Sequence, residues 1–164
     1  MDAFLGAQYI GAIPVPLYPP VRLGKLDEFF ARTATMLASV QAEIVLTNTQ
    51  IRRILGQILT RYTPPKGIVP TSVLTQQSSS PIQHNTHCDD VCLVQFSSGT
   101  TQNPKPVTLT HKQTLANVYA IAHSFPKDNG LPVGCSWLPL YHDMGLIGCV
   151  SVSYTHLRAH ETRT

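Results

Sequence analysis

Charge is scarce in this chain of 164 residues, of which 13% are charged, and the formal net charge is only +3. The Lys and Arg residues are scattered, with Arg52 and Arg53 as their one adjacent pair, so there is no basic stripe that could bind nucleic acid. Hydrophobic residues make up 43%, which at this length is enough for about one buried core. The composition therefore indicates a globular chain that does not bind nucleic acid.

Signals for secretion and for membrane insertion are also lacking. The start, "MDAFLGAQYIGAIPVPL", is apolar but has no basic region before it, and Gln8 and Tyr9 interrupt its small residues. It therefore predicts neither a signal peptide nor a membrane span. The four cysteines stand in a chain without secretory features. We expect reduced thiols and a cytoplasmic location.

A metal site has little support. The segment "HNTHCDDVC" offers four potential ligands close together, namely His84, His87, Cys88 and Cys92. Zinc sites usually pair their ligands as CxxC or HxxxH, and no second well-spaced pair follows here. Cys92 also falls within a predicted buried strand. We therefore expect no metal ligands in this chain.

Short apolar strands alternate with amphipathic helices along the sequence. Such alternation predicts an α/β fold with a largely parallel sheet flanked by helices. The prolines of "IPVPLYPP" favour an extended segment near the N-terminus. We expect helices over residues 26–40, 49–59 and 111–125, and strands over residues 43–47, 73–75, 91–96 and 106–110. In the last helix, the expected apolar face consists of Leu115, Val118, Tyr119 and Ala122, while His111 and His123 are interpreted as surface or packing residues.

Residues 95–106, "QFSSGTTQNPKP", follow the most apolar predicted strand. Small residues, hydroxyl groups and a lysine suit a phosphate-binding loop, although the same residues also make ordinary solvated turns. Ligands of α/β sheets bind beyond the carboxyl ends of strands, which favours the phosphate site. A P-loop of the GxxxxGK[ST] type is disfavoured, because Pro104 and Pro106 occupy the positions of its second glycine and its Mg²⁺-binding hydroxyl.

Three motifs, in the order in which that superfamily has them, resemble the adenylate-forming (AMP-binding) superfamily. Their residues are most similar to those of fatty acyl-AMP ligases and long-chain acyl-CoA synthetases. They are "LVQFSSGTTQNPKPVTLTHKQTLANV", "SWLPLYHDMGLIG" and, upstream, "FLGAQYIGAIPVPLYPP". The first is similar to the phosphate-binding loop of that superfamily and the second to its next core motif. Gln102 and Pro106 depart from the pattern, since the superfamily usually has glycine at both positions.

The resemblance implies an ATP-dependent ligase that forms an acyl-adenylate and then passes the acyl group to a thiol. It implies catalytic roles for Lys105 and His142, and a substrate site at Tyr141, His142 and Asp143. The implied phosphate donors are Ser97, Ser98, Gly99, Thr100, Thr101 and Lys105. ATP and Mg²⁺ are the implied cofactors, with the metal ligand expected outside this chain. A fatty acid or another carboxylic acid is the implied substrate, and CoA or an acyl carrier protein is the implied acceptor.

The resemblance also implies that the chain is part of a larger enzyme, because the later motifs of the superfamily are not found in it. We expect residues 1–151 to be a fragment of the AMP-binding N-terminal domain and to be inactive alone. Residues 152–164 resemble translated sequencing adapter and are expected to be non-native. The alternative is a non-catalytic nucleotide-binding or interaction module, in which the loop serves structure only. Neither the length of the acid nor the choice of acceptor follows from these motifs.

Overall fold

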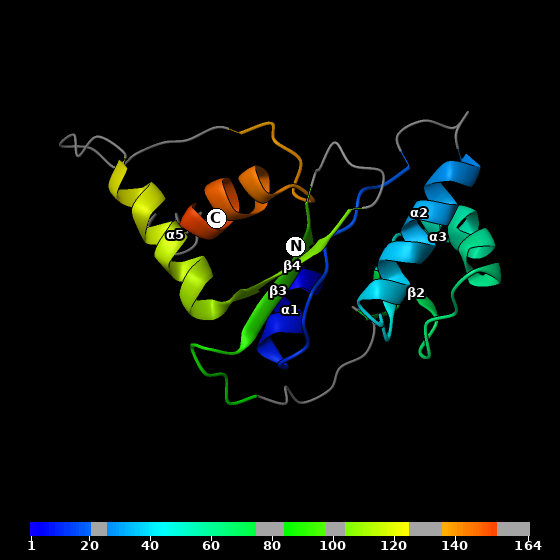
Figure 1. The fold of residues 1–164 in the computed structure, drawn as a ribbon, viewed down its shortest axis with the longest axis horizontal. Coiled ribbons are helices and arrows are strands. Elements are labelled where there is room, and N and C mark those ends of the chain that lie inside the picture. The colour runs from blue at the N-terminus through cyan, green and yellow to red at the C-terminus, as the bar shows by residue number, and fades with distance from the viewer. Residues whose placement is uncertain (21–25, 75–83, 98–103, 125–135, 154–164) are drawn as a thin grey trace, which may run out of the picture.

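The computed structural model describes residues 1–20, 26–74, 84–97, 104–124 and 136–153, and Figure 1 shows how their elements are arranged. The first part contains helices α1 (Asp2–Tyr9), α2 (Leu26–Ser39), α3 (Thr49–Leu55) and α4 (Thr71–Leu74), and strands β1 (Val45–Thr47) and β2 (Ile68–Pro70). A 3₁₀-helix, η2 (Gly56–Thr60), follows α3. The second part contains strands β3 (Val91–Phe96) and β4 (Pro106–Thr110), helix α5 (His111–Ser124) and a π-helix, η3 (Met144–Ser151).

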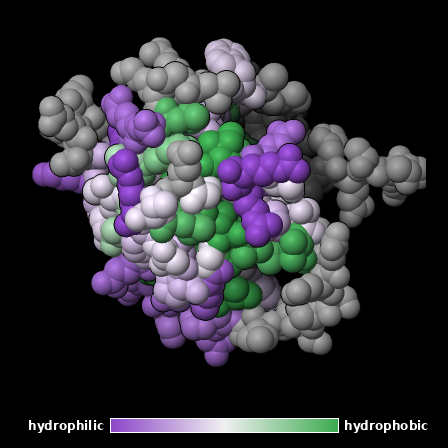
Figure 2. Space-filling model, turned by 90° about the vertical axis from the view of Figure 1, so that its right-hand side faces the viewer, coloured by the Kyte–Doolittle hydropathy of each residue, from purple (hydrophilic) through white to green (hydrophobic). Residues whose placement is uncertain are grey.

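Helix α2 forms as its apolar periodicity predicts. Phe30, Ala34 and Leu37 recur at helical spacing and are buried on one face. Asp27 and Glu28 lie in the first turn, where the helix dipole favours negative charge. The buried face of α2 packs with Leu55, Ile58 and neighbouring side chains into one apolar core. Figure 2 views the molecule from this side and shows apolar surface lying between polar side chains.

The expected α/β fold is confirmed, and the described strands form two separate pairs. Strands β1 and β2 are parallel, with Val45 opposite Ile68, and helix α3 lies in the connection between them. Strands β3 and β4 are antiparallel. The connection at residues 97–105 is shorter than the roughly dozen residues that a parallel crossover requires, so this pair must be a hairpin.

The strand expected at residues 73–75 is wrong for Val73 and Leu74, while Thr75 lies outside the described residues. Val73 and Leu74 belong to helix α4, where both are exposed, and the strand of this region is β2. The neighbouring strand β1 ends at Thr47, which is opposite Pro70. No further residue of β1 is therefore left to pair with Val73 or Leu74.

The second core joins β3, α5 and η3. Its buried members include Leu93, which is 0% exposed, together with Val118, Leu146 and Ile147. Helix α5 begins at a reciprocal cap, since Thr110 Oγ1 accepts from Gln113 N at 3.2 Å and Gln113 Oε1 accepts from Thr110 N at 3.0 Å. This cap turns the chain directly from β4 into α5.

The expected apolar face of α5 is only partly correct. Val118 is buried and Ala122 packs against the core, but Leu115 and Tyr119 are exposed. Ile121, which was not included in that face, packs beside Ala122 against the core. The helix therefore presents to β3 a narrower apolar stripe, centred on Val118.

Candidate functional site

The predicted phosphate loop is the connection of the β3–β4 hairpin. The last strand pair is Phe96 opposite Pro106. Just beyond it, Ser97 N donates to Lys105 O at 3.0 Å, and Lys105 N donates to Ser97 Oγ at 3.3 Å. The two residues that begin and end the loop are thus bonded to each other, and the Lys105 side chain is exposed. Ser98, Gly99, Thr100, Thr101 and Gln102 lie outside the described residues.

Pro106 departs from the usual glycine of the superfamily without disturbing the hairpin. It is the first residue of β4, a position at which proline is tolerated because it needs no backbone donor there. Its partner Phe96 is buried, whereas Pro106 itself is exposed.

The upstream motif, "FLGAQYIGAIPVPLYPP", also forms hydrogen bonds with strand β3. Gln8 Nε2, on helix α1, donates to Cys92 O at 3.1 Å. Val94 N donates to Pro14 O at 3.1 Å, so the extended segment after α1 runs beside the strand (Figure 1). The expected extended conformation of "IPVPLYPP" is confirmed. The strand that leads into the loop is therefore fixed along its length.

The second candidate site is the turn at Tyr141, His142 and Asp143. His142 N donates to Pro139 O at 3.1 Å, which closes the turn. His142 Nδ1 and Asp143 Oδ1 form a close contact, and Asp143 Oδ1 also accepts from Met144 N at 2.7 Å at the start of η3. Asp143 thus both caps a helix and contacts the imidazole ring. This contact leaves Nε2 as the ring nitrogen that faces away from Asp143.

Tight packing beneath the turn fixes its backbone. A Cβ added at Gly145 would lie 2.3 Å from the backbone oxygen of Pro139, so only glycine fits there. Leu146 and Ile147, which follow, are buried in the same core as Leu93 of β3. The hairpin and the turn therefore emerge from one shared apolar core.

The segment before the turn is irregular and exposed. Residues 136–139 form no strand, and Trp137 is 90% exposed. In contrast, most of Val91–Phe96 is buried, with Leu93 and Cys92 nearly inaccessible. The apolar side chain of Trp137 is therefore left uncovered, whereas those of strand β3 are largely buried.

Sequence reasoning missed the contribution of Tyr18. Its ring packs against the ring of Tyr141 in an edge-to-face arrangement. Both residues lie in motifs that the sequence analysis singled out, but no periodicity links positions so far apart. This contact joins the upstream motif to the candidate substrate site.

Burial sets the protonation state of Cys92 in strand β3. Desolvation raises the pKa of the Cys92 thiol above its ordinary value, and a hydrogen bond with Thr114, 3.1 Å from Sγ to Oγ1, partly offsets the increase. Cys92 is therefore a protonated packing residue at neutral pH.

Among the described residues, no group of three or more His, Cys, Asp and Glu side chains could hold a metal ion.

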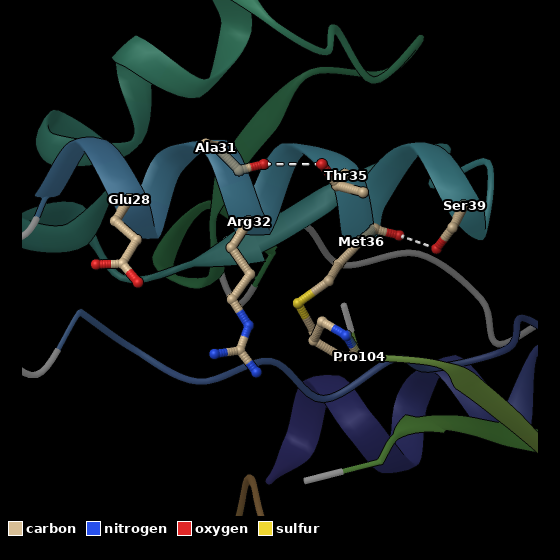
Figure 3. Close-up of a pocket in the computed structure, with 7 residues that line it drawn as sticks. All are labelled: Glu28, Ala31, Arg32, Thr35, Met36, Ser39 and Pro104. Atoms are coloured by element: carbon tan, nitrogen blue, oxygen red, sulfur yellow. Dashed lines mark hydrogen bonds between the residues drawn. The ribbon is translucent and has the colours of Figure 1, made fainter. Parts of the chain in front are cut away.

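A shallow cavity of about 260 Å³ lies between helix α2 and the base of the hairpin. Figure 3 shows Met36 reaching from α2 towards Pro104, while Arg32 and Glu28 project from the same side of the helix.

Within the described part of the chain, no helix is both long and apolar enough to cross a membrane.

The sequence of this chain is similar to those of known fatty acid ligases. The chain is 37% identical over 156 residues to a long-chain fatty acid AMP ligase of Mycobacterium tuberculosis, with 88% of this chain and 26% of that ligase covered. It is 30% identical over 186 residues to a medium-chain fatty acid acyl-carrier-protein ligase of Teredinibacter turnerae, with 88% and 28% covered. The chain thus spans about a quarter of the length of these relatives.

Solved structures agree with the sequence relatives. The fatty acyl-adenylate ligase of L. pneumophila, solved with acyl adenylate and pyrophosphate, superposes with a TM-score of 0.75 at 32% identity, over 92% of this chain and 25% of that chain. The family model described as "AMP-binding enzyme" matches residues 1–157. By both sequence and fold, the chain belongs to the AMP-binding enzyme family.

Proposed function

We propose that this chain forms part of an AMP-forming acid ligase that converts a fatty acid and ATP into fatty acyl-AMP. The observation that carries the proposal is the hairpin closed between Ser97 and Lys105, which holds an exposed lysine at the end of the predicted phosphate loop. We refer below to the complete ligase that carries this sequence as the parent enzyme.

The proposed reaction has two steps. A carboxylate oxygen attacks the α-phosphorus of ATP, the bond to the bridging oxygen of pyrophosphate breaks, and pyrophosphate leaves. A thiolate sulfur then attacks the acyl carbon and AMP leaves. Negative charge accumulates on the departing pyrophosphate, and we assign its neutralisation to the Lys105 ammonium with the donors of residues 98–101. Each hydrogen bond to an ionised oxygen contributes about 1.5–3 kcal/mol.

We place the acyl end of the adenylate beside the turn at Tyr141 and His142. The contact between Asp143 and Nδ1 orients the ring and leaves Nε2 directed away from Asp143. Nε2 donates to the carboxylate and α-phosphate oxygens when the ring carries both of its protons. Asp143 then acts as a positioning residue. This arrangement could not assist the reaction through Nδ1, because that nitrogen already faces Asp143.

Cofactors and partners are proposed from the same family context. Mg²⁺ would accompany ATP, with its protein ligand supplied by a part of the parent enzyme outside this chain. Fatty acids are the proposed substrates because two relatives are named for long-chain and medium-chain acids. Either CoA or an acyl carrier protein would supply the thiol. A cytoplasmic location fits the three described cysteines, all of which are free thiols.

Carboxylate-dependent exchange of pyrophosphate into ATP tests the proposal. The parent enzyme should catalyse exchange with fatty acids of one range of lengths, without any thiol acceptor. Exchange should stop when the acid is omitted or Mg²⁺ is chelated. If ATP binds but no acid in a panel of short, medium and long chains supports exchange, the chain is instead a non-catalytic nucleotide-binding module.

A further inference from the structure

The base of the hairpin departs from regular strand pairing at Ser97. In a hydrogen-bonded antiparallel pair, the two opposite residues exchange both of their backbone N–H···O bonds. Ser97 and Lys105 make only one such bond, from Ser97 N to Lys105 O. The Lys105 N–H turns instead to the Ser97 hydroxyl oxygen at 3.3 Å. A side chain therefore takes the place of a backbone carbonyl at this position.

The neighbouring pair of Phe96 and Pro106 supplies no ladder hydrogen bond. Proline has no N–H, and in an antiparallel ladder the pairs that exchange backbone bonds alternate with pairs that do not. The next pair along the hairpin is Ser97 and Lys105, whose two hydrogen bonds join the ends of the loop. With the Ser97 hydroxyl removed, a single backbone bond would hold Lys105 in register with β3.

We propose that Ser97 serves the reaction as a positioning residue, which fixes the backbone from which the Lys105 side chain projects. The inference rests on the proposed function, in which the Lys105 ammonium neutralises the departing pyrophosphate. It differs from the role of phosphate donor that the sequence predicts for Ser97. The hydroxyl acts through the Lys105 N–H, and its effect on the reaction depends on the presence of the lysine ammonium.

A double-mutant cycle in the parent enzyme tests this dependence, with kcat/KM for MgATP in the exchange reaction as the readout. Ser97→Ala should lower kcat/KM about three- to ten-fold, the value of one neutral hydrogen bond. Ser97→Thr keeps the hydroxyl and should restore activity to within about two-fold of wild type. Ser124→Ala is the matched control, because that hydroxyl bonds only within helix α5, to Ala120 O.

The decisive comparison uses Lys105. Lys105→Ala should cost about ten-fold to a thousand-fold, and adding Ser97→Ala to it should change kcat/KM by less than about two-fold. If the second substitution instead lowers activity by its full single-mutant factor, Ser97 contacts phosphate directly and the inference is wrong. A normal Ser97→Ala enzyme would also overturn it. A normal Lys105→Ala enzyme would refute the proposed phosphate role itself, which separates the two failures.

Discussion

The rings of Tyr18 and Tyr141 meet edge to face, with centroids 5.1 Å apart and planes inclined by 65°. Tyr18 belongs to the extended segment that runs beside β3, and Tyr141 directly precedes His142. The backbone of the same segment bonds to β3 through Pro14. One short stretch of chain thus contacts both the strand that leads into the predicted phosphate loop and the turn that carries the predicted acyl site.

We expect Tyr18→Ala in the parent enzyme to weaken use of the acid more than use of ATP. Loss of an aromatic pair costs about 0.5–1.5 kcal/mol beyond the lost buried area. Because the turn rather than the hairpin loses its support, KM for the fatty acid should rise several-fold while KM for MgATP changes little. Tyr18→Phe keeps the ring and is the control. Equal increases in both KM values for Tyr18→Ala would show that the contact supports only the general fold.

His142→Ala should reduce adenylate formation by about ten-fold or more while the melting temperature changes little. The side chain of His142 is 40% exposed, so its removal leaves no buried cavity. His123→Ala, on the surface of α5, is the matched control. Exchange rates and thermal unfolding are measured on the same preparations. A large drop in melting temperature with normal specific activity would identify His142 as a packing residue instead.

Cys92 should resist alkylation in the folded protein, whereas the exposed Cys88 should react. Burial favours the protonated thiol, and the thiolate is the reactive form. Peptide mapping after brief treatment with iodoacetamide measures both sites. Equal labelling of the two cysteines under native conditions would contradict the buried position of Cys92.

The raised pKa of Cys92 also predicts a pH dependence of stability. As the pH rises through the ordinary thiol range, above about pH 8, the unfolded chain releases this proton before the folded chain does. The free energy of unfolding should therefore fall there. Denaturant titrations at several pH values measure the slope. Cys92→Ala should remove this contribution, and an unchanged slope in that variant would assign the effect to other groups.

Elements defined by strong local patterns could be predicted from the sequence. The helix at residues 26–40 follows from apolar residues at helical spacing, and the strand at Val91–Phe96 follows from a short, nearly continuous apolar run. The strand at residues 73–75 was wrong because three residues carry no periodicity, and pairing with β1 decides the outcome. Leu115 and Tyr119 were expected to be buried but are exposed, because the packing of α5 on β3 decides which face of the helix is buried.

For the candidate site, the residue types could be predicted from the sequence, but the contacts between them could not. Its residue types could be found from motifs, because a phosphate loop needs small, hydroxyl and basic residues in a short stretch. The contact of Tyr18 with Tyr141 and the bond from Lys105 to the Ser97 hydroxyl depend on tertiary packing and strand register. Neither property is encoded in the spacing of residues along the chain.

Identification of the nucleotide product and of the acyl intermediate tests the central claim most directly. The parent enzyme is incubated with MgATP and a fatty acid in the absence of thiol, and the products are analysed by mass spectrometry. We predict release of pyrophosphate and accumulation of fatty acyl-AMP. Lys105→Ala should slow this accumulation at least about ten-fold, whereas Lys66→Ala, at an exposed ion pair with Glu43, should not. Formation of ADP and phosphate, or no acid-dependent product at all, would contradict the account.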